Sequence, residues 1–252
     1  MLREDLDNFS TKEITMPKRL QKEIDKLKQD LMDMADLSKK ALGKAIQTIE
    51  QRDISLAKTL IYEDDIIDRK ENDVEEECLK LLALYQPVAV DLRLIISVLK
   101  INNDLERIAD LAANIAQKAI WLQKREPIES PFNLTLMESK VQSMLEKSIE
   151  AFVRLDIGLA QRVRHADEEV DEIHRHAYEA VKAVMRNHPE RIDSLIDLLS
   201  VSRSLERIAD SATNIAEDVI YLAEGEIARH KPIVLDYQNP RSSASSPITK
   251  TH

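Results

Sequence analysis

Two stretches of this chain are nearly identical and lie 100 residues apart: residues 105–116 read LERIADLAANIA, and residues 205–216 read LERIADSATNIA. Self-similarity over so long a period indicates a duplicated structural unit. In both copies the apolar residues recur at spacings of three and four, which is the pattern of one face of an α-helix. The stretch therefore predicts a helix that occurs twice, in the two halves of a tandem repeat.

The helical pattern extends to both sides of the first copy. Apolar residues follow it between residues 20 and 49, then again after Asp53, which can cap a helix, until Pro87 interrupts the chain. In the second half, a helix over roughly residues 133–155 precedes Asp156, and Pro189 takes the place of Pro87. We therefore predict an all-α fold of six long helices, arranged as a tandem repeat of two three-helix bundles.

Proline and serine mark the ends of this organisation. We predict a flexible N-terminus over residues 1–16, a first three-helix repeat over 17–126, a second over 132–228, and a flexible tail over 229–252. The tail contains three prolines and the apolar run Ile233, Val234 and Leu235, which we expect to dock at most weakly.

The composition excludes several classes of protein. The formal net charge of -10 disfavours nucleic acid as a partner, because an acidic surface repels phosphate backbones. The chain has one cysteine, Cys78, for which we expect a place in helix packing, and no apolar stretch long enough for a signal region or a membrane span. We expect a soluble protein of a reducing compartment, and hence a cytoplasmic one.

The repeated helix carries an acidic stripe. Glu106, Asp110 and Asn114 are spaced by four residues and so share one helix face, as do their counterparts Glu206, Asp210 and Asn214. Two carboxylates at this spacing repel each other, and a hard or borderline cation would turn that repulsion into attraction. Alanines beside the stripes, among them Ala109 and Ala209, are expected to leave the carboxylates accessible.

The preceding helix of each half has an acidic pair of its own. Asp64 and Asp68 lie four residues apart in the first half, with Glu71 one turn further; in the second half the pair is Asp167 and Asp171, with His174 one turn further. If neighbouring helices bring the pairs and stripes together, each half offers four carboxylates to one metal centre. The alternative is a solvated charged face, which duplication alone would copy into both halves.

Familiar catalytic motifs are not found in the sequence. It contains no glycine-rich phosphate loop and no Gly-x-Ser-x-Gly elbow. Di-iron enzymes of helical bundles need paired Glu-x-x-His motifs, and only Asp171 and His174 approach this spacing. All six histidines lie in the second half, where surface positions explain them.

The repeated LERIAD sequence resembles the signature of the PhoU family, usually Leu-Glu-Arg-Ile-Gly-Asp, and the segment Gln86–Arg93 is similar to the stretch before it. The resemblance covers residues 18–225. It implies a non-enzymatic, cytoplasmic and often dimeric accessory protein of the phosphate ABC transporter. Such a protein restrains phosphate-starvation signalling through a sensor histidine kinase and meets the membrane only through these partners.

The resemblance also implies metal ions on the acidic faces, iron or else Mn, Mg, Ca or Zn. By matching position, the ligands fall on Glu106, Asp110, Glu206 and Asp210, with a less distinctive match at Asp64, Asp68, Asp167 and Asp171. Ala109 and Ala209 replace the usual glycine, and Arg203 and Ser204 make the second site less anionic than the first. Two alternatives remain open: a carboxylate-bridged metal enzyme in a helical bundle, and a helical adaptor without metal.

Overall fold

The computed structural model describes residues 18–225, and all of the long elements in this range are helices. Their bounds are α1 Lys18–Gln51, α2 Ile54–Tyr85, α3 Ala89–Gln123, α4 Leu134–Arg154, α5 Ile157–Asn187 and α6 Ile192–Glu224, with a short 3-10 turn, η1, at Pro189–Arg191. The predicted all-α class and six long helices are confirmed. The predicted flexible ends, 1–16 and 229–252, lie outside the described residues.

The helix starts follow from local side-chain chemistry. Oδ1 of Asp53 accepts a hydrogen bond from the backbone N–H of Leu56 at 3.0 Å, and Oδ1 of Asp156 accepts one from Leu159 at 2.8 Å. Each cap satisfies a backbone donor that the first helical turn leaves unpaired, which stabilises a helix by about 1 kcal/mol. The two capping aspartates predicted from the sequence therefore occupy equivalent places at the starts of α2 and α5.

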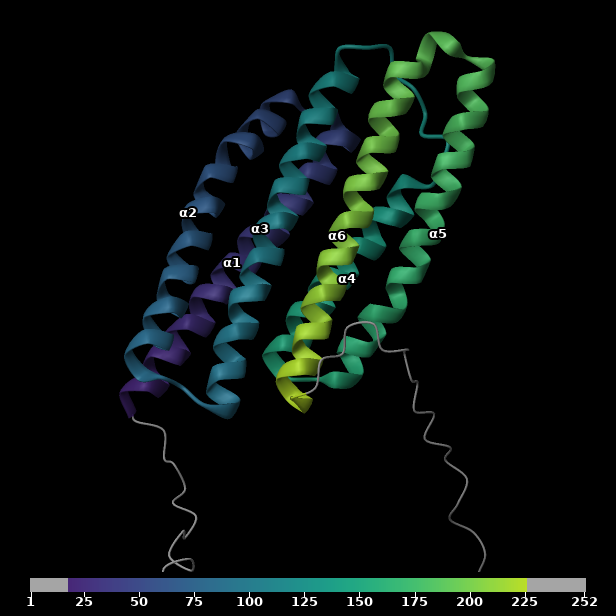
Figure 1. The fold of residues 1–252 in the computed structure, drawn as a ribbon. Helices are drawn as coiled ribbons and strands as arrows, with labels where there is room; N and C mark the ends of the chain where they lie inside the picture. The colour runs from purple at the N-terminus through teal and green to yellow at the C-terminus, as the bar shows by residue number, and fades with distance from the viewer. Residues whose placement is uncertain (1–17, 226–252) are drawn as a thin grey trace, which may run out of the picture.

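The two repeats, α1–α3 and α4–α6, pack against each other through their last helices. In Figure 1, α3 and α6 lie side by side at the centre of the molecule and run in opposite directions. Lys100 Nζ is 2.9 Å from Oδ1 of Asp218, and Asn214 Nδ2 donates to Oδ1 of Asp104 at 3.1 Å. This antiparallel register brings Ala109 opposite Ala209, near an approximate twofold axis that relates the repeats.

The core extends through both repeats without a break. Leu105 and Ile108 of α3 and Leu205 and Ile208 of α6 are fully buried, and they belong to one cluster of apolar side chains to which all six helices contribute. Cys78 is also buried in this core, as expected for a cysteine that packs between helices. None of the helices in residues 18–225 is long and apolar enough to cross a membrane.

One helix breaks the symmetry of the repeats. When the repeats are aligned on their capping residues, Asp53 and Asp156, Leu134 at the start of α4 corresponds to Leu31. Helix α1, however, already begins at Lys18. The additional segment Lys18–Asp30 has no counterpart in the second repeat. It is held in place by Leu20, Ile24 and Leu27, all of which are buried.

Candidate functional site: two acidic faces

The first acidic face consists of Asp64 and Asp68 on α2 and Glu106 and Asp110 on α3. The electrostatics show that the four carboxyl groups lie close together. Burial raises the pKa of Asp64 to about 6, and the charges of Asp68 and Asp110 contribute to this rise. Burial also raises the pKa of Glu106, with added contributions from Asp110, Asp68 and Asp64. The predicted meeting of the α2 pair with the α3 stripe is therefore present in the structure.

The second acidic face repeats this arrangement on α5 and α6, with Asp167, Asp171, Glu206 and Asp210. Burial raises the pKa of Asp167 to about 7, followed by the charges of Asp171 and Asp210. Burial and the charge of Asp171 raise the pKa of Asp210 as well. Oδ1 of Asp167 is buried and has no hydrogen-bond partner within residues 18–225, which leaves a carboxylate oxygen available to a cation.

The residue one turn beyond each acidic pair differs between the repeats. In the first repeat it is Glu71, whose backbone carbonyl accepts a hydrogen bond from Nδ2 of Asn102 at 2.9 Å. In the second it is His174, whose Nδ1 lies 2.8 Å from the hydroxyl of the buried Ser202. The half-buried ring of His174 is not the simple surface histidine expected from the sequence, because it joins α5 to α6 beside the second acidic face.

Three arginines distinguish the electrostatics of the two faces. The charges of Arg107 and Arg207 lower the pKa of Asp210, and those of Arg203 and Arg207 lower the pKa of Glu206. In the part of the chain that the structure describes, no arginine is among the groups that shift the pKa of Asp64 or Glu106 on the first face. Arg107 belongs to α3, so the first repeat partly neutralises the acidic face of the second. The sequence pattern indicates a role for Arg203 but not for Arg107, because only the antiparallel crossing of α3 and α6 brings Arg107 near.

The asparagines of the two stripes behave differently. Asn114 is exposed, and its Nδ2 donates to Oδ2 of Asp110 at 3.4 Å, within the stripe. Asn214 instead donates across the repeat interface to Asp104. The expectation that Asn214 extends the second stripe is therefore wrong, because Asp104, which is buried, needs a hydrogen-bond donor.

The alanines of the motif pack between helices and do not border the carboxylates. Ala109, Ala112, Ala209 and Ala212 are all at most 1% exposed. Small residues allow α3 and α6 to approach each other closely, which explains why the motif needs them at these positions. The expectation that they keep the acidic faces accessible is corrected. Access comes from the acidic residues themselves, since Asp68, Asp110 and Asp171 are exposed.

Carboxylates are suitable ligands for a hard or borderline cation. In this structure, however, they are not close enough together to coordinate one. Within residues 18–225, no three acidic, histidine or cysteine side chains converge closely enough to hold a metal ion as they stand. The two faces are nonetheless all-oxygen donor sets whose mutual repulsion a cation would relieve. A bound ion would have to draw these side chains together by rotation of their χ angles.

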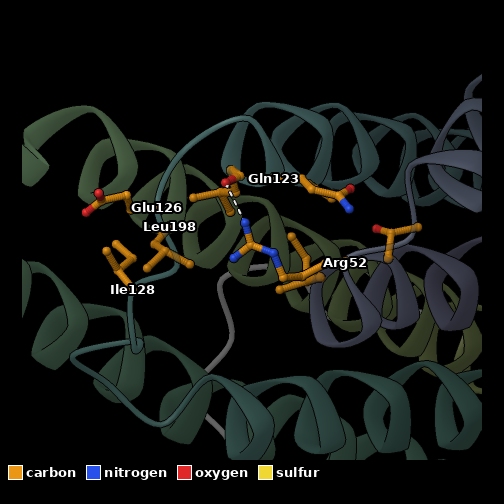
Figure 2. A pocket seen from close by; sticks show the side chains of 9 residues that line it. Arg52, Gln123, Glu126, Ile128 and Leu198 are labelled. Carbon is orange, nitrogen blue, oxygen red and sulfur yellow. Dashed lines mark hydrogen bonds between the residues drawn. The ribbon is translucent and has the colours of Figure 1, made fainter.

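A small cavity, partly open to solvent, lies apart from both faces, where α1 and α3 end. Its volume is about 70 Å³, and Figure 2 shows the Arg52 guanidinium at its centre, with Ile128 and Leu198 beside each other. Nη2 of Arg52 donates to the backbone carbonyls of Leu122 and Arg125, at 3.1 and 3.2 Å. These bonds satisfy carbonyls at the end of α3, so the guanidinium acts here as a helix cap.

Comparison with known proteins assigns the chain to a family. The family model described as "PhoU domain" matches twice, at residues 31–119 and 134–219. A phosphate-specific transport system accessory protein PhoU homolog of Aquifex aeolicus is 39% identical over 215 residues, which cover 85% of this chain and 97% of that protein.

Solved structures agree with the sequence match. The crystal structure of PhoU from Pseudomonas aeruginosa superposes with a TM-score of 0.79 at 37% identity, covering 82% of this chain and 100% of that chain. The phosphate transport system regulatory protein PhoU from Streptococcus pneumoniae gives a TM-score of 0.77 at 29% identity, covering 82% and 98%. With a family match in each repeat and the same arrangement of helices, this chain belongs to the PhoU family.

Proposed function

We propose that this protein regulates phosphate transport and restrains the response to phosphate starvation. It would act in the cytoplasm, as a homodimer, by contact with the phosphate ABC transporter and with a sensor histidine kinase. The observation that supports this most directly is the match of both repeats to one family, together with relatives named accessory or regulatory proteins of phosphate transport.

The proposed cofactor is a metal ion on each acidic face. Asp64, Asp68, Glu106 and Asp110 would hold it on the first face, and Asp167, Asp171, Glu206 and Asp210 on the second. Such an ion would neutralise four clustered carboxylates and so change the charge that a partner meets. Iron, Mn, Mg, Ca and Zn all fit oxygen donors, with iron or Zn favoured where His174 can join the ligands.

The exposure of the faces favours a regulator over an enzyme. A carboxylate-bridged metal enzyme needs its metal in a closed pocket with an open coordination position. Here Asp68, Asp110 and Asp171 are exposed on the outer surface of the helices, where a partner can reach them. A regulator needs only a few kcal/mol of differential binding to shift the equilibrium of its partner.

Deletion of the gene tests the proposed function. A starvation-induced reporter is expected to stay on in rich phosphate in the deletion strain, and to be switched off again when the intact gene is restored. A second strain carries Glu106→Gln with Asp110→Asn, to separate loss of the protein from loss of an acidic face. Equal and low reporter output in the parent and deletion strains would mean that the protein is not a restraint on this response.

A further inference from the structure

An open hollow lies at the end of the molecule where α3 ends and α6 begins (Figure 1). It has a volume of about 410 Å³ and is lined by Trp121, Lys124 and Arg125 from the α3 side and by Asp193, Ile196 and Asp197 of α6. Trp121, the single tryptophan of the chain, is 39% exposed, Ile196 is 48% exposed, and Ile192, one helical turn earlier, is 38% exposed. Large apolar side chains that gather on the surface in this way indicate a contact surface.

A buried carboxylate holds the charged walls of this hollow in place. Asp197 is 5% exposed; its Oδ1 lies 3.2 Å from Nζ of Lys118, and its Oδ2 accepts a hydrogen bond from Nη1 of Arg125. The ammonium group of Lys118 also lies 4.3 Å from the centre of the Trp121 ring, so the indole packs against a fixed cation. Side chains that are fixed before binding lose little conformational entropy when a partner docks, which favours affinity.

The second repeat shows that the fold does not require an exposed tryptophan at this place. At the equivalent positions, 100 residues later, Tyr221 replaces Trp121 and Gly225 replaces Arg125. Tyr221 is half-buried, with Nζ of Lys100 at 5.2 Å from the centre of its ring, and Gly225 has no side chain with which to form an ion pair. The exposed aromatic ring and the paired arginine therefore occur at only one of the two equivalent places.

The charges around the hollow indicate what a partner should carry. Three basic side chains lie with two acidic ones, and the chain as a whole has a net charge of -10; the five are Lys118, Lys124, Arg125, Asp193 and Asp197. Both Lys118 and Arg125 share the single buried carboxylate of Asp197, and the exposed Lys124 forms no ion pair within residues 18–225. A carboxylate of a partner can therefore pair with Lys124 and Arg125 at the rim of the hollow.

The residue types favour another protein as the occupant. Tryptophan and arginine are enriched among the residues that contribute most to protein–protein binding. A second copy of this chain suits the hollow less well, because a symmetric dimer would place this concave surface against itself.

We infer that this hollow is the docking site of the regulatory partner, a protein that inserts an apolar side chain beside Trp121 and Ile196 and places a carboxylate against Lys124 and Arg125. The inference rests on the proposed function, which supplies that partner. On α3, Trp121 follows Asn114 by seven residues, or two helical turns, so both lie on the side of α3 that carries the first acidic face. A docked partner therefore extends towards that face.

A starvation-induced reporter in rich phosphate tests the site in cells that produce the full-length protein. The deletion strain receives the parent gene, Ile196→Asp, which puts a charge in the hollow, or Leu136→Asp, a matched change at a similarly exposed position on α4. We expect Ile196→Asp to raise reporter output several-fold, towards that of the deletion strain, and Leu136→Asp to keep it low. Lys124→Glu should raise the output as well, because it repels the carboxylate of the partner, whereas Lys147→Glu at an exposed position on α4 should not.

The outcomes separate the docking site from the proposed function. If deletion raises reporter output but both hollow variants keep it low, the docking site is wrong and the proposed function stands. Low output in the deletion strain itself would overturn the proposed function and the docking site together. Immunoblots compare the amounts of the variants, and Lys124→Glu, which changes only an exposed side chain, decides the result if Ile196→Asp lowers the amount of protein.

Light scattering of the purified parent and Ile196→Asp proteins identifies the occupant. Equal molar masses are expected, because the partner is a different protein. A change from dimer to monomer in Ile196→Asp would overturn the inference, since a second copy would then occupy the hollow.

Discussion

Asn214 of α6 donates a hydrogen bond from Nδ2 to Oδ1 of Asp104 on α3, at 3.1 Å across the interface between the repeats. Asp104 is buried, and burial raises its pKa to about 6, while this hydrogen bond lowers the pKa by favouring the ionised form. The equivalent asparagine of the first repeat, Asn114, is exposed on the surface. The same residue of the motif therefore stabilises the interface in one repeat and faces solvent in the other.

We predict that Asn214→Ala lowers the free energy of unfolding by about 1–3 kcal/mol, the cost of leaving a buried acceptor unpaired. The loss should be larger at pH 8 than at pH 5, because protonated Asp104 depends less on the donor. Chemical denaturation at the two pH values measures both effects. Asn114→Ala is the matched control and should change stability by less than about 0.5 kcal/mol; equal losses in the two variants would contradict the interface role.

Paired neutral substitutions test the acidic faces as metal sites. We expect Glu106→Gln with Asp110→Asn to lower the metal content of the purified protein, and Glu206→Gln with Asp210→Asn to lower it independently. Hard cations need several oxygen ligands, so the loss of two should weaken binding sharply. Mass spectrometry of the bound metals gives the measurement. Unchanged content in both double variants would rule the faces out as metal sites and favour the metal-free adaptor.

Arg107 should weaken cation binding at the second face, because its charge lowers the pKa of Asp210 from the other repeat. In a background that carries Glu106→Gln with Asp110→Asn, we expect Arg107→Gln to tighten Mn²⁺ binding by roughly fivefold, equivalent to about 1 kcal/mol for one partly screened charge. Titration calorimetry measures the Mn²⁺ affinity of each variant. Lys147→Gln removes the same charge from an exposed position on α4; an equal gain in that variant would show a general charge effect instead.

A buried carboxyl group in the second repeat predicts how stability depends on pH. Glu138 of α4 is 4% exposed, and burial, followed by the charge of Glu50, raises its pKa from 4.5 to about 7. Between these values the folded protein holds a proton that the unfolded chain has released, so stability falls as the pH rises through this window. The decrease should be roughly 2–3 kcal/mol, because each pH unit between the two pKa values lowers the free energy of unfolding by at most about 1.4 kcal/mol.

Glu138→Gln should remove the contribution of Glu138 to that decrease and raise stability at pH 8, whereas Asp64, Asp104 and Asp167, whose pKa values are also raised, should maintain the remainder. Thermal unfolding in a metal-free buffer between pH 4.5 and pH 8 provides the comparison. Glu172→Gln, at an exposed position on α5, is the control and should keep the decrease of the parent protein. If the profile of Glu138→Gln matched that of the parent, another group would have to account for the dependence.

The fold could be predicted from the sequence because its determinants are local. Asp53 and Asp156 cap helices by contacts with residues three positions away, and the spacing of Leu105, Ile108 and Ile115 defines a buried face within a single helix. The duplication supported the remaining helix assignments, because each helix predicted in one half has an equivalent in the other half. The way in which the repeats pack was not predictable, because it depends on Lys118 and Arg125 reaching the buried Asp197 on α6.

The acidic faces were predictable only as residues that share a helix surface. Spacing placed Glu106 next to Asp110, and pairing with Asp64 and Asp68 followed from the assumption that α2 and α3 are neighbours. The role of Arg107 beside Asp210 and the turning of Asn214 towards Asp104 both depend on the antiparallel crossing of α3 and α6. No pattern within one helix indicates such contacts between helices from different repeats.

The crossing of Ala109 and Ala209 also bears on how the chain folds. Because α3 and α6 complete one core, a chain that ended after the first repeat would expose the side of α3 that contacts α6, including Asp104, which is buried in the intact protein and accepts a hydrogen bond from Asn214. Neither repeat then has a complete hydrophobic core of its own. The duplicated halves should therefore unfold in a single cooperative transition, and during synthesis the first half must wait for the second before it reaches its final stability.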